Sequence, residues 1–517
     1  MNKCDIPENI TFKNHFHIIG IWIITHRILL LLSLITGVGI FLRFYTLGSE
    51  SIWFDEAASI YSAKNPLILM LMECVGGHRH PPLHFIILKI WIILFNDSEA
   101  AVRSISAIFG AASIPMIYLV GKRVFSSKVG LIASFLLSIS VYAIHYSQEA
   151  RSYAILLFLT LLSFYLFIKI MEDRDIRKAY FVAYFIANTL LVYTHYFGLF
   201  VVASQLSYYF ITRRYLKINE RLFWYATGAS GIVFLPWAVV FVVFSIPRSF
   251  SWEQPTLHNI ISTLAAFSGY GDINRYWILL GFGCLCILGL SVRKMIKRRK
   301  PEENSVNVRP YAKFKMSFNM EVLLVVMWLA FPILLPFLIS QIPLKMTGIY
   351  LTRYTISALP AFLILVANGI GVFLSRKILY PLFAVILIGI TCCSVTSLQD
   401  YYTQTGKEQW REAVNLVEAS IQPEDALVVN EWYFCKAIEY YSNNDLMTQG
   451  IESGSEEQAI NRFKANGKQR IWLVQVNWGS KSTINYMETM FDENSLLLKQ
   501  QFVGIDVYLY DLTHPPR

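Results

Sequence analysis

Long apolar stretches alternate with short polar loops over roughly the first 400 residues of the chain. Many of these stretches run about 18 residues or more with few charges, which is long enough to cross a hydrocarbon core of about 30 Å. They are apolar on all sides, whereas a helix on the surface of a soluble protein has one apolar stripe. The pattern therefore predicts an all-α polytopic membrane domain.

About eleven of the segments are expected to span the membrane. The first covers residues 27–47 and follows an N-terminal tail at 1–26 that has no small-residue cleavage site. The segment Leu83–Phe95 is short for a span, and we interpret it as an interfacial or re-entrant helix. The other predicted spans are 104–121, 129–146, 152–170, 179–195, 196–212, 222–245, 275–292, 320–340, 355–374 and 378–396.

The composition changes where the predicted membrane domain, residues 27–398, ends. Residues 399–517 carry frequent charges and short alternating segments. Strands are predicted at Ala426–Val429, Arg470–Val476 and Phe502–Tyr510, with a helix over Glu408–Ser420. We expect a small α/β domain here, on the extracytoplasmic side.

The composition agrees with a membrane protein, because charged residues make up only 15% of the chain while a soluble protein carries roughly 25%. A formal charge of +10 could indicate nucleic-acid binding, but the basic residues cluster in alternate short loops. Such loops face the cytoplasm in membrane proteins. The N-terminus is then cytoplasmic, the C-terminal domain is extracytoplasmic, and no nucleic-acid partner is predicted. The basic loops contain Lys122 and Arg123, Arg177 and Lys178, Arg213 and Arg214, the run 293–300, and Arg376 and Lys377.

The seven cysteines are scattered and have no metal-type spacing. No cofactor is predicted, and a divalent metal has no support in the sequence. Cys74 and Cys435 are the cysteines expected outside the cell, and whether they pair is left open.

Two adjacent carboxylates, Asp55 and Glu56, follow the first span in a predicted outer loop at 48–103. A carboxylate at a membrane boundary is often functional, and it can act as a general base. The alternative is a solvated pair of loop residues. In the same loop, His80 precedes two prolines; it could bind phosphate or orient Asp55, or it could only mark a turn.

Other charged and aromatic residues are predicted on the same outer face although they are far apart in sequence. The positive-inside rule should deplete cations there, so a phosphate ligand is a reasonable explanation for them. Snorkelling or local pairing is the alternative for each one. The residues are Arg103, Glu149, Arg151, His195, Lys345, Tyr350, Arg353 and Tyr354.

Short motifs occur in order along residues 40–415. Together they resemble the GT-C superfamily of membrane glycosyltransferases, in particular the bacterial branch of the protein O-mannosyltransferase and aminoarabinose transferase families. The motifs are Trp53-Phe-Asp-Glu-Ala, His80-Pro-Pro-Leu, Arg103-Ser-Ile-Ser, Ser147-Gln-Glu-Ala-Arg-Ser-Tyr, His195-Tyr-Phe-Gly, Arg353-Tyr and Gln409-Trp-Arg-Glu-Ala.

The resemblance implies a sugar donor linked to a polyprenyl phosphate, which enters from the bilayer, and an acceptor on the outer face. Asp55 would be the general base, with inversion at the anomeric carbon, and Glu56 would help to position acceptor or sugar. Arg353 and Lys345 are candidates for stabilising the phosphate that leaves. The sugar, the oligomeric state and the kind of acceptor, whether protein, lipid or glycan, are not determined by the sequence.

Two other functions are weighed against this one. A transporter or flippase of lipid-linked sugars would show inverted repeats and charged or broken helices at mid-membrane, and neither is clear in the sequence. A glycan ligase or polymerase shares the architecture but lacks the Asp-Glu pattern of the first loop.

Overall fold

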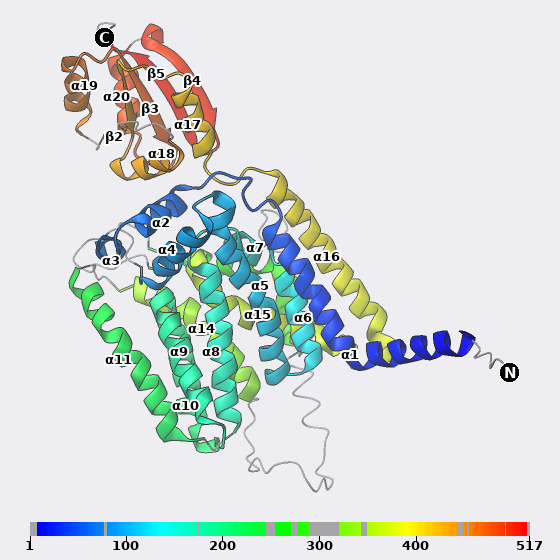
Figure 1. Ribbon diagram of the computed structural model, residues 1–517. Coiled ribbons are helices and arrows are strands. Elements are labelled where there is room, and N and C mark those ends of the chain that lie inside the picture. Colours follow the sequence, from blue (N-terminus) through cyan, green and yellow to red (C-terminus); the bar gives the residue numbers. More distant parts are fainter. Residues whose placement is uncertain are drawn as a thin grey trace, which may run out of the picture.

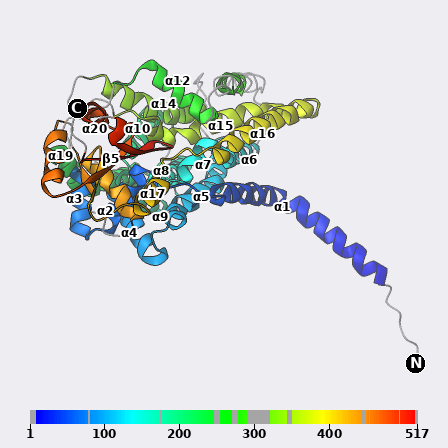
Figure 2. The same cartoon turned by 90° about the horizontal axis from the view of Figure 1, so that it is seen from above.

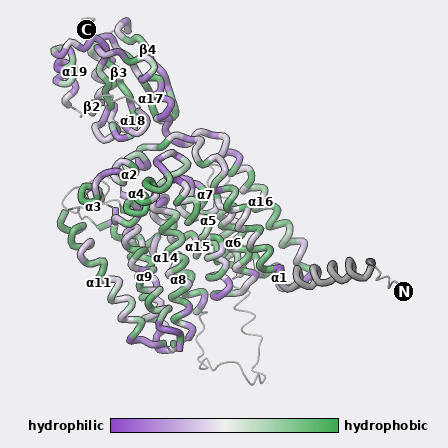
Figure 3. The backbone as a smooth tube through the Cα atoms, in the orientation of Figure 1, coloured by the Kyte–Doolittle hydropathy of each residue, from purple (hydrophilic) through white to green (hydrophobic). Residues whose placement is uncertain are grey.

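The helices form a bundle that carries a small α/β domain at one end, as seen in the computed structural model (Figure 1). The structure describes residues 8–76, 80–173, 175–216, 218–244, 254–269, 278–289, 320–342, 349–442, 448–451, 454–491 and 493–513. Apolar residues cover the bundle, and hydrophilic residues gather over the α/β domain and at the opposite end (Figure 3). This distribution is that of a membrane domain with a water-exposed module at one end.

The first helix, α1 (Glu8–Phe44), begins inside the predicted N-terminal tail, and its start projects away from the bundle (Figures 1 and 2). Its apolar part, His26–Phe44, is long enough to cross a membrane. Near its end, the buried Arg43 donates hydrogen bonds to the carbonyl oxygens of Leu137 at 3.0 Å and Ser138 at 3.2 Å. These carbonyls end helix α6, so the cation satisfies groups that the helix itself leaves unpaired.

Seven of the described helices are long and apolar enough to cross a membrane, or eight if α6 and α7, bent by 60°, form one span. Every predicted span overlaps a helix of the described chain, so the predicted fold class is confirmed, while the count of about eleven stays a prediction. Long and short helices together make up the bundle after α1 and the first loop. They are α5 (Glu99–Val124), α6 (Ser127–Ser138), α7 (Val141–Ser147), α8 (Tyr153–Glu172), α9 (Lys178–Thr194), α10 (Phe197–Thr212), α11 (Glu220–Phe244), α12 (Leu257–Ser268), the helix Ile278–Gly289, α14 (Met320–Ser340), η2 (Thr352–Ala358), α15 (Leu359–Ile370) and α16 (Tyr380–Thr403).

The basic loops that the structure describes lie at the end of the bundle opposite to the α/β domain (Figures 1 and 3). There Arg123 forms an ion pair with Glu172, and Lys128 donates to the carbonyl oxygen of Leu374 at 3.2 Å. The gathering of these loops at one end agrees with the alternation seen in the sequence. The membrane and the side on which this end lies remain predictions.

The first loop forms a layer of three helices below the α/β domain (Figure 1). The first two of these helices are separated at Pro66, because proline lacks the N–H that would continue a helix. Lys89 donates to the carbonyl oxygens of Ala63 at 3.1 Å and Asn65 at 2.8 Å, where the first of the three helices ends. The helices are α2 (Phe54–Lys64), α3 (Leu67–Gly76) and α4 (Leu83–Phe95).

The C-terminal domain is built on a five-stranded sheet in the order β2-β1-β3-β5-β4. β1 pairs in parallel with β2 and β3, while β5 is antiparallel to both β3 and β4. The strands are β1 (Asp425–Val429), β2 (Thr448–Gly450), β3 (Arg470–Val476), β4 (Leu496–Phe502) and β5 (Ile505–Asp511); the helices are α17 (Trp410–Glu418), α18 (Cys435–Tyr441), α19 (Glu456–Ala465) and α20 (Ser482–Met490).

One predicted strand in this domain, Phe502–Tyr510, was placed wrongly at its start. Phe502 ends β4, and β5 begins only at Ile505 after a tight hairpin turn. Gly504 has a φ of +75°, which a short hairpin turn favours and glycine adopts without strain. Cys74 and Cys435, whose pairing the sequence left open, are both free.

Candidate functional site

Asp55 lies in the first turn of α2, where the end of the helix favours a negative charge. Its Oδ2 atom is 3.7 Å from Nη2 of Arg151 and 3.6 Å from Nη2 of Arg353. The side chain is 22% exposed. The two guanidinium groups therefore attract the carboxylate from two sides, yet the contacts are longer than charge-assisted hydrogen bonds. Asp55 is held in place and can still accept a proton from a ligand.

Imidazole and tyrosine rings lie beside the two guanidinium groups that contact this carboxylate. The rings of His195 and Tyr354 lie 4.7 Å apart, and those of His80 and His195 lie 5.3 Å apart. His80 Nε2 is 3.5 Å from Nη2 of Arg151, the partner of Asp55. The structure thus brings together six of the residues singled out in the sequence: Asp55, His80, Arg151, His195, Arg353 and Tyr354.

Four buried polar atoms at this site have no hydrogen-bond partner among the described residues. They are Nε1 of Trp53, the hydroxyl of Tyr153, Nε2 of His195 and Nε of Arg353. The side chains adjoin one another: Arg353 lies over the ring of Trp53 at 5.8 Å, and Tyr153 lies 6.3 Å from His195. A buried donor without an acceptor is costly, so such groups usually mark a place that a ligand or water fills.

The protonation of His195 is determined by its surroundings. Its Nδ1 accepts a hydrogen bond from the backbone N–H of Phe197 at 3.2 Å, so the ring proton is on Nε2. Burial, together with the nearby positive charges of Arg151 and Arg353, lowers the pKa of His195 to about 3. The imidazole is therefore neutral and offers one donor. Together, the four unpartnered groups match a ligand that is rich in acceptor oxygens, such as a phosphate or a sugar.

Glu56 and Arg103 form a separate, closed network beside the Asp55 site. Arg103 donates to both oxygens of Glu56, at 2.9 and 2.7 Å, and the backbone N–H of Ala150 donates to the same carboxylate at 2.7 Å. The remaining N–H groups of Arg103 reach the backbone carbonyls of the loop before α2, those of residues 47, 50 and 51. Both side chains are buried, so they hold the loop in shape and have no open position for a substrate.

The charge of Glu56 is stabilised by its partners. Burial by itself would raise the pKa of Glu56, but the charges of Arg103 and Lys407 and the donated hydrogen bonds outweigh it and lower the pKa to about 2. A carboxylate with so low a pKa is a poor base at neutral pH. Of the two adjacent acids, Asp55 is the better candidate for proton transfer, because it is partly exposed while both oxygens of Glu56 already accept hydrogen bonds within the protein.

Two other predicted residues, Glu149 and Tyr350, have different surroundings. Glu149 is buried and pairs with His145, with 3.1 Å between its Oε1 and Nε2 of the histidine. The hydroxyl of Tyr350 shares a 2.8 Å hydrogen bond with Thr263. Lys345 lies outside the described residues. Among the described residues, no group of three or more His, Cys, Asp and Glu side chains is arranged to hold a metal ion.

The sequence analysis missed Trp53, Tyr153 and Lys407. Trp53 and Tyr153 stand in the motifs that carried the resemblance. Their nearness in sequence to Asp55 and Arg151 could therefore have indicated that they belong to the site. Lys407 had no local signal. Its Nζ atom lies 3.4 Å from Oε2 of Glu56 although the two residues are 351 positions apart.

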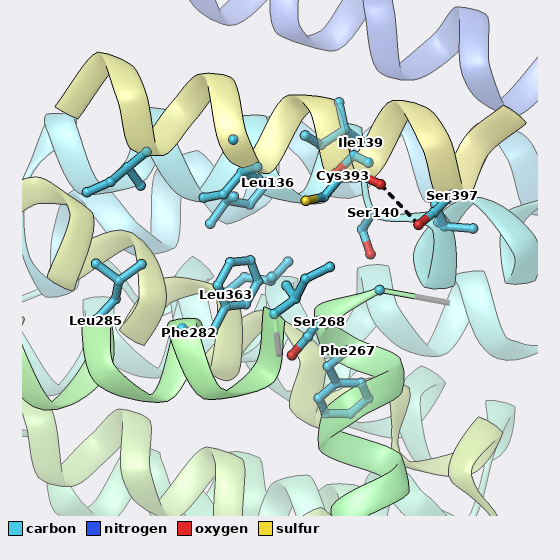
Figure 4. A pocket seen from close by; sticks show the side chains of 18 residues that line it. Leu136, Ile139, Ser140, Phe267, Ser268, Phe282, Leu285, Leu363, Cys393 and Ser397 are labelled. Carbon is cyan, nitrogen blue, oxygen red and sulfur yellow. Dashed lines mark hydrogen bonds between the residues drawn. The ribbon is translucent and has the colours of Figure 1, made fainter. Parts of the chain in front are cut away.

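An apolar cavity of about 360 Å³ opens between α6, α12, α15, α16 and the helix Ile278–Gly289 (Figure 4). Leu136, Phe282 and Leu363 are among the side chains that line it. The ring of Tyr142 packs 5.3 Å from Phe267, one of the residues that line the cavity. The hydroxyl of Tyr142 donates to the carbonyl of Thr352, immediately before Arg353, at 2.6 Å. Within the membrane bundle, such a space fits an apolar chain.

Part of the membrane bundle resembles a known protein family. A family profile described as "Dolichyl-phosphate-mannose-protein mannosyltransferase" matches residues 79–240, a range that includes His80, Arg151 and His195 but neither Asp55 nor Arg353. A comparison with curated protein sequences gives no significant match.

Solved structures extend the likeness over most of the chain. ArnT from Cupriavidus metallidurans bound to undecaprenyl phosphate has 13% identity and a TM-score of 0.58, with 92% of this chain and 97% of that chain covered. The oligosaccharyltransferase AglB from Archaeoglobus fulgidus, in complex with an inhibitory peptide and a dolichol-phosphate, has 12% identity and a TM-score of 0.56, with 94% and 74% covered. These matches confirm the predicted resemblance to the GT-C superfamily of membrane glycosyltransferases.

Proposed function

We propose that this protein transfers a sugar from a polyprenyl-phosphate donor to an acceptor at the end of the bundle that carries the C-terminal domain. The observation that supports this function most directly is the cluster around Asp55. There, a carboxylate lies between two guanidinium groups, among buried donors that lack partners in the described chain. Cations and donors of this kind suit a phosphate and a sugar, and the carboxylate suits an acceptor hydroxyl or amine.

In the proposed reaction Asp55 takes the proton from the acceptor as its oxygen or nitrogen attacks the anomeric carbon. The bond between that carbon and the phosphate oxygen breaks, and the configuration at the carbon inverts. The lipid phosphate leaves with the electron pair. Arg353, which is partly exposed, and Arg151 lie close enough to Asp55 to stabilise the negative charge that develops on this phosphate. Lys345 is a further candidate cation in the adjoining segment.

A lipid-linked donor is supported by two observations. The ArnT and AglB structures hold undecaprenyl phosphate and a dolichol-phosphate, respectively. In this protein Tyr142 links the apolar cavity of Figure 4 to the residue before Arg353, since its ring packs against Phe267 of the cavity wall and its hydroxyl donates to the carbonyl of Thr352. We infer that the cavity takes the first part of the polyprenyl chain, while the phosphate reaches Arg353.

His80, His195 and Tyr354 are the proposed contacts of the sugar and the acceptor. Their rings face one another beside Arg151, and the neutral His195 offers a donor. With the basic loops on the cytoplasmic side of the cell membrane, the reaction takes place on the outer face, below the extracytoplasmic domain 399–517. The acceptor is a protein, a lipid or a glycan of the cell envelope.

The function is tested by mass spectrometry of envelope glycans and glycoproteins from a strain that lacks the protein. We expect a sugar-bearing species to disappear, and to return with the wild-type gene but not with Asp55→Asn. Purified protein should in parallel release undecaprenyl phosphate from one member of a panel of undecaprenyl-phosphate sugars. Identical glycans in all strains, or equal rescue by Asp55→Asn, would refute the proposed transferase; equal rescue is the result that a flippase would give.

A further inference from the structure

The first turn of α2, which carries Asp55, is held from the side of the C-terminal domain. Oε2 of Glu408 accepts a hydrogen bond from the backbone N–H of Phe54 at 3.1 Å. Phe54 is the first residue of α2, and the N–H groups at a helix start have no partner within the helix. A carboxylate at this position also complements the helix dipole.

Glu408 is itself rigidly held. Its Oε2 accepts a second hydrogen bond from Nε1 of Trp410 at 2.6 Å, and its Oε1 accepts one from Nε1 of Trp478 at 2.6 Å. The side chain is buried. Both oxygens are therefore fixed by the body of the C-terminal domain, and the position of Phe54 follows that of the domain.

The side chain of Phe54 strengthens the same attachment. Its ring lies 5.1 Å from Phe434, 5.5 Å from Tyr433 and 6.0 Å from Trp478. Aromatic pairs at these separations attract one another in tilted and edge-on arrangements. The residue immediately before Asp55 thus inserts its ring into an aromatic pocket of the other domain.

Lys407, also in the C-terminal domain, contacts two further segments beside the site. Its buried Nζ is 3.4 Å from Oε2 of Glu56 and donates to the backbone carbonyl of Gln148 at 2.9 Å. Gln148 belongs to the short segment that leads to Arg151, the partner of Asp55. One lysine of the C-terminal domain therefore joins the helix that carries Asp55 to the segment that carries its guanidinium partner.

Further contacts join the C-terminal domain to the loop before α2. The backbone N–H of Gly406 donates to Glu50 at 2.7 Å, and the hydroxyl of Ser51 donates to Glu412 at 2.8 Å. Gly406, Lys407 and Glu408 are consecutive, and Glu412 follows in the first turn of α17, so the start of the C-terminal domain is held against the loop at several points.

We propose that Lys407 and Glu408 are positioning residues, which hold Asp55 at its distances from Arg151 and Arg353, and that the C-terminal domain thereby completes the site. The catalytic consequence rests on the proposed function, whereas the positional claim does not. A displacement of about 1 Å at a reacting group costs roughly 10²-fold in rate, so loosening the turn lowers turnover more than substrate binding.

The positional claim is tested in the full-length protein in lipid nanodiscs by hydrogen–deuterium exchange. Glu408→Gln keeps the size of the side chain. It replaces one of the two acceptor oxygens with an NH₂ group, which cannot accept the hydrogen bonds that Phe54, Trp410 and Trp478 donate. A hydrogen bond to a charged group is worth about 1.5–3 kcal/mol, so exchange over residues 52–58 should rise roughly 10-fold or more. The control is Glu457→Gln, which removes the same charge from an exposed position on α19. Exchange over 52–58 that stays at the wild-type rate in Glu408→Gln would overturn the proposal.

The catalytic consequence is tested with the undecaprenyl-phosphate sugar that the wild type turns over. Glu408→Gln should lower kcat roughly 10-fold in the protein that remains folded at the assay temperature, with the donor KM near wild type, and should add little to the loss in Asp55→Asn. Lys407→Met serves as the second variant, and an unchanged kcat in both variants contradicts the proposal. If the wild type transfers no sugar from any donor, the proposed function fails, while the exchange experiment still decides whether the domain holds the turn.

Discussion

Asp55 and Arg353 face each other across the site, with 3.6 Å between Oδ2 and Nη2. The pair joins the first turn of α2 to the start of η2, two elements that lie far apart in the sequence of the membrane domain. A proton acceptor and a phosphate-binding cation are thereby adjacent, which a transfer from a phosphate-linked donor requires. The contact also places a negative charge beside the partly exposed guanidinium of Arg353.

The role of the carboxylate is tested by Asp55→Asn, which keeps the size of the side chain and removes the base. Turnover should fall by about 10²-fold or more, as expected for the loss of a positioned general base. Folding and donor binding should be retained, because Asp55 is partly exposed and its ion pairs are long. Rate measurements on purified protein, with melting temperatures as the control, check this. Near-normal turnover would show that Asp55 is not the base.

The role of Arg353 is tested by comparing Arg353→Ala with Arg353→Lys. A guanidinium binds two phosphate oxygens in a planar fork, which an ammonium cannot reproduce. Donor affinity should therefore fall strongly in Arg353→Ala and recover only in part in Arg353→Lys. The measurement is titration with the undecaprenyl-phosphate sugar in correctly folded variants. If Arg353→Ala has the wild-type donor affinity and rate, Arg353 does not contact the phosphate.

Glu56→Gln should lower stability instead of changing the chemistry. It leaves the buried charges of Arg103 and Lys407 without their partner, and breaking a buried ion pair costs roughly 3–5 kcal/mol. Thermal unfolding and expression should both show the loss, whereas Asp55→Asn, the neighbouring control, should melt close to wild type. A stable but inactive Glu56→Gln would move the catalytic role to Glu56.

Acid should weaken the same network. The pKa of Glu56 is lowered from 4.5 to about 2, so its contribution to stability is complete above pH 4.5 and is lost as the pH falls toward 2. The melting temperature of the wild type should fall over this window. The fall should be smaller in Glu56→Gln, which has no carboxylate to protonate. Equal acid sensitivity in both proteins would contradict this explanation.

The topology is tested by single cysteines and an impermeant thiol reagent applied from outside the cell. Positions near Asp55, Gly269 and Asn430 should react, because all three are predicted on the outer side. A position near Glu303, in the basic loop beyond the described residues, should react only after the cells are opened. Labelling near Glu303 in intact cells would overturn the predicted orientation.

The sequence alone was sufficient to predict the membrane domain and the C-terminal α/β domain, and to single out Asp55 as a candidate residue. Hydropathy decides the spans because water is absent from the hydrocarbon core, so a run of apolar residues must be a helix whatever its neighbours are. The strands at 425–429 and 470–476 were visible for a related reason, since their core-facing residues are apolar. The tight turn at Gly504 was missed because the apolar pattern continues on both sides of it.

The different surroundings of Asp55 and Glu56, and hence their different proposed roles, were decided only by the tertiary structure. The two acids are adjacent and chemically alike, but successive residues of a helix point in different directions. Glu56 is turned inward, where Arg103 and Lys407 enclose it, while Asp55 is turned toward Arg151 and Arg353. Lys407 is 351 positions away from Glu56. Contacts of this range depend on how the helices pack and where the C-terminal domain lies, and no local pattern in one sequence records either.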